Sequence, residues 1–71
     1  MTEKTLMQIA RKTPNGIVKV KELPKCDFCD RTAVVDGKTV FGPWAYMCIK
    51  HYQDFGVGLG LGKGQVLVVE D

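Results

Sequence analysis

The stretch that decides the fold is residues 26–51, which read CDFCDRTAVVDGKTVFGPWAYMCIKH. It begins with Cys26-x-x-Cys29 and ends with Cys48-x-x-His51, and these are the only cysteines and the only histidine among 71 residues. A gap of two residues lets both side chains of a pair reach one ion, and Zn²⁺ takes four nitrogen or sulfur ligands in a tetrahedron. The spacing therefore predicts one structural zinc ion bound by Cys26, Cys29, Cys48 and His51.

Two other interpretations of these residues remain open at this point. A Cys26–Cys29 disulfide would leave Cys48 unpaired, and the N-terminal residues lack the apolar stretch of a secretory signal. A reducing compartment is therefore expected. Alternatively, His51 is a surface side chain and a carboxylate is the fourth ligand. That carboxylate would belong to Asp27, Asp30 or Asp54.

The size of the chain makes a metal important for its stability. We expect one zinc-binding domain over residues 1–71, with a basic extension (1–25), a zinc core (26–56) and a glycine-rich segment followed by a strand (57–71). Ordering so many residues costs on the order of 100 kcal/mol, which a core this small offsets only narrowly. A structural zinc contributes about 10–16 kcal/mol. No apolar run reaches the length of about 18 residues that a membrane span needs.

The formal charge of +2 is unevenly distributed. Residues 1–25 carry six basic and two acidic side chains, whereas residues 26–71 carry four basic and six acidic ones. Zinc brings two positive charges and displaces three thiol protons, which lowers the net charge from +2 to +1. Any polyanion would therefore bind to the N-terminal third. Its candidate contacts there are Arg11, Lys12, Lys19, Lys21 and Lys25.

Hydrophobic spacing predicts the elements on either side of the zinc core. Residues 4–12 show a short helical stripe, with Thr2 as a possible cap and residues 14–16, Pro-Asn-Gly, as a stop. Residues 16–23 alternate like a half-exposed strand. Residues 65–69 form an apolar run, which predicts a mostly buried strand that could pair with residues 17–22.

The residues between the two ligand pairs predict a β-hairpin. One version has a tight turn at Asp36-Gly37, which pairs Val35 with Lys38. The other has a wide loop over residues 37–43, which pairs 32–35 with 44–47, and the break at Gly42-Pro43 favours it.

A short helix is predicted after the hairpin, over residues 49–55, with Gly56 as its stop. A knuckle, a hairpin and a helix that opens with ligands form a treble-clef-like zinc site. The expected fold is therefore a small α+β domain with an extra N-terminal helix and strand and a C-terminal strand.

Several segments together resemble a group of small, mostly uncharacterised bacteriophage-encoded zinc-finger proteins. The residues that carry the resemblance are Cys26, Cys29, Gly42-Pro43-Trp44-Ala45, Cys48, His51, residues 56–60 (GVGLG) and residues 62–65 (GKGQ). About 40 of the 71 residues are covered. The resemblance implies a phage or prophage origin, the cytoplasm of a bacterial host and a treble-clef-like zinc site, but no biochemical function, and it leaves out residues 1–25.

The glycine-rich segment invites a comparison with a phosphate-binding loop. That motif needs a glycine at position 57 and Ser or Thr at position 64, where this chain has Val57 and Gly64. Alternate glycines instead let another group approach the backbone closely. We expect this group to be Trp44, with a partner backbone or a phosphate near Lys63 as the other possibilities.

The ligand set argues against an enzyme. All four positions of the zinc would be filled, and no second histidine is available to activate water. Two binding functions remain: a protein-interaction factor that docks on a host or virion protein, which we favour, and a DNA- or RNA-binding protein that uses the basic N-terminal third. A third possibility is a piece of a larger assembly. Phe28, between two ligands, is the aromatic side chain that we expect to contact a partner.

Overall fold

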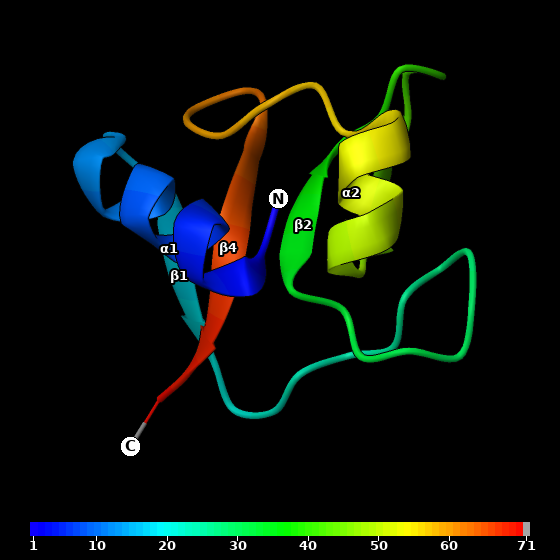
Figure 1. Cartoon of the computed structure of the whole chain (residues 1–71), viewed down its shortest axis with the longest axis horizontal. Coiled ribbons are helices and arrows are strands. Elements are labelled where there is room, and N and C mark those ends of the chain that lie inside the picture. Colours follow the sequence, from blue (N-terminus) through cyan, green and yellow to red (C-terminus); the bar gives the residue numbers. More distant parts are fainter. Residues whose placement is uncertain (71) are drawn as a thin grey trace.

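The computed structural model describes residues 1–70 and shows a small α+β domain (Figure 1). Its elements, in chain order, are α1 (Glu3–Lys12), β1 (Ile17–Val20), β2 (Val35–Lys38), β3 (Trp44–Met47), α2 (Ile49–Phe55) and β4 (Gly64–Val69). Neither of the two helices among these residues is long and apolar enough to cross a membrane.

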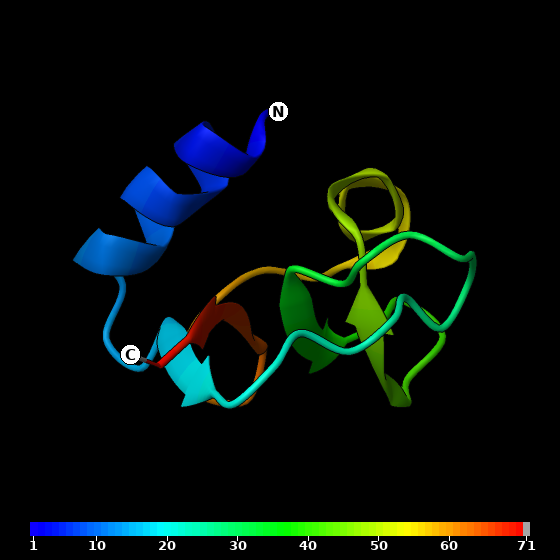
Figure 2. The same ribbon diagram turned by 90° about the horizontal axis from the view of Figure 1, so that it is seen from below.

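The four strands form one mixed sheet in the order β1-β4-β2-β3. β4 runs parallel to β1, with Ile17 opposite Val66, and antiparallel to β2, with Val35 opposite Val66. The predicted pairing of the C-terminal strand with the N-terminal one is therefore confirmed. Both helices lie on the same side of the sheet (Figure 2), where they cover a core of Leu6, Ala10, Val35, Met47 and Val66.

The two predicted helices are confirmed, together with their ends. The Thr2 hydroxyl accepts a hydrogen bond from the Thr5 N–H at 3.1 Å, which satisfies one of the free donors at the start of α1. α2 ends at Gly56, where an added Cβ would lie 2.5 Å from the Tyr52 ring. The glycine is needed there for space, because its φ of −72° is open to any residue.

The predicted hairpin exists, but its register is wrong in both versions. β2 covers residues 35–38 rather than 32–35, and it pairs Val35 with Met47 and Lys38 with Trp44 around a loop of residues 39–43. Asp36 and Gly37 lie inside the strand and form no turn. A Cβ on Gly37 would be 2.9 Å from the Lys63 carbonyl oxygen, so the glycine serves the close approach of β2 and β4.

The prediction that the glycine-rich segment packs on Trp44 is also wrong. Trp44 is 46% exposed, on the face of the sheet opposite the core residue Met47. An added Cβ would instead contact Lys63 from Gly58, and Thr13 and Pro14 from Gly60. The segment turns back through backbone hydrogen bonds between Gly60 and Gly64 at 2.7 and 3.0 Å.

Candidate metal centre

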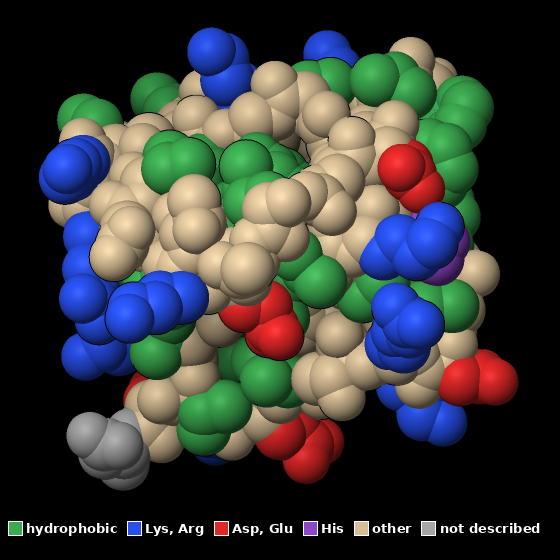
Figure 3. Space-filling model, viewed as in Figure 1, with side chains coloured by type: hydrophobic (Ala, Val, Ile, Leu, Met, Phe, Trp, Pro, Cys, Tyr) green, Lys and Arg blue, Asp and Glu red, His purple; other side chains and the backbone are tan. Residues whose placement is uncertain are grey.

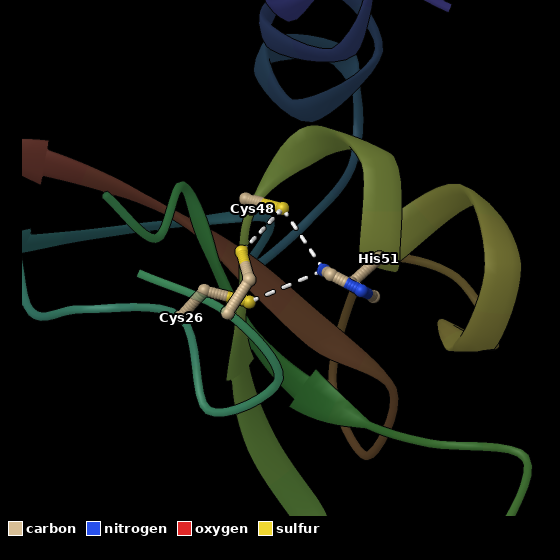
Figure 4. A group of neighbouring side chains, drawn as sticks. Cys26, Cys48 and His51 are labelled. Carbon is tan, nitrogen blue, oxygen red and sulfur yellow. Dashed lines mark hydrogen bonds between the residues drawn. The ribbon is translucent and has the colours of Figure 1, made fainter. Parts of the chain in front are cut away.

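The four predicted ligands come together in the structure. Cys26 and Cys29 lie in the knuckle, which we define as residues 26–31, and Cys48 is the N-cap of α2. His51 follows on the first turn of α2, so it faces the same point as Cys48 (Figure 4). One ligand atom from each of the four residues lies within 4.8 Å of every other. This group is suited to hold one metal ion.

Three of the separations between these atoms are close to those around a tetrahedral ion. With bonds of about 2.3 Å to sulfur and about 2.0–2.1 Å to nitrogen, a tetrahedron places two sulfurs about 3.8 Å apart and a sulfur and a nitrogen about 3.5 Å apart. Cys29 Sγ and Cys48 Sγ are 3.8 Å apart. His51 Nδ1 lies 3.5 Å from Cys26 Sγ and 3.2 Å from Cys48 Sγ. Nδ1 is therefore the imidazole nitrogen that would bind the ion.

Backbone N–H groups of the knuckle point at the sulfurs. The Phe28 N–H donates to Cys26 Sγ and the Arg31 N–H donates to Cys29 Sγ, both at 3.4 Å. Cys26 and Cys29 thus each receive a hydrogen bond from the residue two positions further on. Such bonds favour the thiolate over the thiol, and only the thiolate binds a metal.

The thiols influence one another's ionisation. Burial opposes ionisation of Cys26, but hydrogen bonds from the Cys48 and Phe28 N–H groups and from the neighbouring thiols hold its pKa below the ordinary value. At Cys29 the Arg31 N–H lowers the pKa, yet burial and the two neighbouring cysteines outweigh it and raise the pKa. Ionisation of Cys26 is therefore favoured, and it opposes ionisation of Cys29. A bound cation removes that repulsion.

The other interpretations of these residues find no support in the structure. The three cysteines are free thiols. The carboxylate of Asp54 pairs with Lys50 at 3.4 Å, and that of Asp27 accepts the Tyr46 N–H at 2.8 Å. Asp30 is exposed, and none of the three aspartates belongs to the cluster of Cys26, Cys29, Cys48 and His51.

Asp27 attaches the knuckle to the outer edge of the sheet. Its N–H donates to the Tyr46 carbonyl at 2.8 Å, and its carboxylate accepts the Tyr46 N–H. β3 is the last strand on that side, so Asp27 occupies hydrogen-bonding groups that would otherwise face outward. Asp27 was identified from the sequence only as a possible ligand, because nothing local signals a contact 19 positions away.

We expect Asp27→Ala to destabilise the metal-loaded protein by about 1–2 kcal/mol, because the Tyr46 N–H loses its acceptor. Asp27→Asn keeps a side-chain oxygen at the same place and should cost less than half as much. Thermal melts of both variants measure the difference. Equal melting of Asp27→Ala and the natural protein would show that this contact carries no stability.

Aromatic side chains gather beside the metal centre. Phe28 lies 5.4 Å from the His51 ring and 5.1 Å from Phe55, and Phe41 lies 5.1 Å from Phe55, measured between ring centroids. All three phenylalanines of the chain belong to this group. None of them is in the buried core, and Phe28 and Phe41 are 40% and 65% exposed. We call Phe28, Phe41, His51 and Phe55 the aromatic strip.

The residues predicted to contact a partner occupy separate places. Phe28 is exposed, as predicted. It belongs to the aromatic strip, but the positions of Phe41 and Phe55 in the sequence do not reveal that they lie beside it. Arg11 and Lys12 lie in the last turn of α1. Lys19 lies in β1 and Lys21 follows it, whereas Lys25 is bridged to Thr32 at the start of the knuckle. Lys63 lies in the turn before β4.

Comparisons of the chain with models of protein families, with curated proteins and with solved structures gave no match. The resemblance to phage zinc-finger proteins therefore stays a prediction.

Proposed function

We propose that the chain is a non-enzymatic protein-interaction module whose fold is held together by one structural Zn²⁺ in a treble-clef-like site. Three sulfurs and one imidazole nitrogen, with three separations close to those in a tetrahedron, are a donor set that zinc prefers. The knuckle, the β2–β3 hairpin and α2 supply the parts of a treble clef. Four protein ligands fill the coordination sphere and leave no position for water, which favours a structural over a catalytic ion.

The observation that carries the interaction role is the exposed aromatic strip. A domain of 71 residues needs apolar area for its core, yet this chain exposes two of its three phenylalanines, Phe28 and Phe41, beside the candidate metal centre. The third, Phe55, is half-buried against the core and contacts both rings. The loop that holds Phe41 is also fixed in place: the Thr39 hydroxyl donates to the Pro43 carbonyl at 2.8 Å and accepts the Phe41 N–H at 3.3 Å. Aromatic side chains on a rigid frame are typical of binding hot spots.

Phe41→Ser tests this role. Because Phe41 is 65% exposed, the variant should keep its free energy of unfolding within about 1 kcal/mol of that of the natural protein. It should nevertheless lose its partner. Protein captured from a bacterial lysate, treated with nuclease to remove bridging nucleic acid, should decrease at least tenfold. Leu61→Ser is the matched control, since Leu61 is 82% exposed and lies outside the strip. Equal loss with both variants contradicts the proposal, and so does capture by the natural protein that disappears when the lysate is treated with nuclease.

Nucleic-acid binding remains the alternative, and its support is the basic N-terminal third, in which no carboxylate among residues 1–70 lies within 4.0 Å of a lysine or arginine. We expect this binding to be weak and sensitive to salt, because only about three to five basic side chains would reach phosphates at once. Fluorescence anisotropy with random duplexes and single strands at two salt concentrations measures it. Submicromolar affinity at physiological salt would make nucleic acid the favoured partner.

A further inference from the structure

The two outer edges of the sheet are treated differently. At β3 the knuckle covers the edge, because Asp27 binds both the N–H and the carbonyl of Tyr46. At β1 no further strand or bridge follows among residues 1–70, so this edge is open (Figure 1). An open edge offers free backbone donors and acceptors to another chain.

The hydrogen bonds of β1 to β4 determine which backbone groups are free. Val66 N–H donates to the Gly16 carbonyl at 2.8 Å, and Glu70 N–H donates to the Val20 carbonyl at 2.9 Å. In a parallel pair alternate residues face the partner strand. The N–H and C=O groups of Ile17 and Lys19 therefore point away from β4, at the spacing that an added strand requires.

Basic side chains surround this open edge. Arg11 and Lys12 end α1 next to it, and Lys19 and Lys21 lie on β1 and directly after it. We call these four residues the basic edge; Figure 3 shows Lys and Arg side chains gathered over the end of α1 and over β1. All four are exposed, and no carboxylate among residues 1–70 lies within 4.0 Å of them.

We propose that the outer edge of β1 binds an extended acidic segment of a partner protein as an added β-strand. The free groups of Ile17 and Lys19 would supply backbone hydrogen bonds, and the basic edge would select acidic side chains. The same charges repel a second copy of the chain, which would bring its own Lys19 to this edge. This surface is separate from the aromatic strip and does not depend on the function proposed for it.

A defined peptide tests the proposal. The probe is a seven-residue peptide of alternating valine and glutamate with blocked ends, added to zinc-loaded, ¹⁵N-labelled protein. We expect shifts of the Ile17 and Lys19 amide signals, slower exchange of both amides, and an affinity that falls with salt. The corresponding valine–lysine peptide should bind at least tenfold more weakly.

Lys19→Pro is the decisive variant. Besides the lysine charge, proline removes a backbone N–H that points outward, so the hydrogen bonds to β4 remain while the added strand loses a donor. Binding of the acidic peptide should fall at least tenfold, whereas Lys19→Gln, which removes only the charge, should lower it a few-fold. If Lys19→Pro loses amide dispersion, the slowed exchange of Ile17 and Lys19 in the natural protein decides instead.

Several outcomes would overturn the proposal. They are equal binding of acidic and basic peptides, undiminished binding by a folded Lys19→Pro variant, and shifts confined to other surfaces. No binding at all would mean that the lysines only protect the edge from aggregation. If a random DNA duplex shifts these amides and the acidic peptide does not, the basic edge is a nucleic-acid surface.

Discussion

Removal of the metal by a chelator at neutral pH should unfold the protein. The buried core consists of a few small and medium-sized side chains on one face of a four-stranded sheet. Such a core cannot offset the conformational entropy of 70 ordered residues by itself, whereas a structural zinc supplies about 10–16 kcal/mol. We expect elemental analysis to find one zinc per chain and the dispersion of the amide spectrum to collapse as zinc is withdrawn.

Single substitutions can identify the four ligands. Cys48→Ser and His51→Gln should each lose the metal, while Asp54→Asn and Asp30→Asn, which remove carboxylates close to the site in sequence, should keep one zinc per chain. Falling pH should also release zinc, because three thiolates and the imidazole must regain protons. Survival of the dispersed spectrum after complete zinc removal would show that the sheet and α1 hold the fold without metal.

The second large effect is expected at Gly37. Its Cα faces Gly64 across the β2–β4 pair, and an added Cβ would lie 2.9 Å from the Lys63 carbonyl oxygen and 3.0 Å from the Gly64 Cα. Both neighbours are backbone atoms, so neither can rotate away. Gly37→Val should therefore push the central strands apart and cost about 2–3 kcal/mol, which lowers the melting temperature of a domain this size by roughly 10–20 °C.

Gly62→Ala is the comparison for this prediction. Nothing lies within 4 Å of a Cβ at Gly62, and only its φ of +79° opposes a side chain. The cost of that backbone conformation is about 1–2 kcal/mol. The melting temperature of zinc-loaded Gly37→Val should be lower than that of zinc-loaded Gly62→Ala. The reverse order would mean that β2 and β4 can separate at Gly37 without loss of stability.

The parts of the fold that the sequence predicts correctly depend on neighbouring residues. The Thr2 cap, the stripe of Leu6 and Ala10, and the apolar run of β4 each carry their signal within a few positions. The ligand set is predictable for the same reason, since each pair fixes two positions on one short turn. The bounds of α2 are predictable as well, because Cys48 is its N-cap and Gly56 is its C-cap.

The parts that failed depend on distant residues. Asp36-Gly37 has the composition of a hairpin turn, but Gly64, 27 positions later, requires Gly37 inside the strand. The glycine-rich segment shows that backbones approach closely without showing which ones. Similarly, the aromatic strip joins residues from the knuckle, the hairpin loop and α2, and no periodicity connects them.

The parallel pairing of β1 with β4 implies that a bound metal would also affect the rate of folding. These strands are joined by a long chain segment, and closing that segment into a loop costs entropy that rises with its length. A metal bound by Cys26 and His51 would link these two residues directly. The effective loop would then lack the 24 residues between them, about half of the connection. Halving a loop lowers its closure cost by about 0.6 kcal/mol, or roughly threefold in rate. We therefore expect the sheet to close faster once the metal is bound.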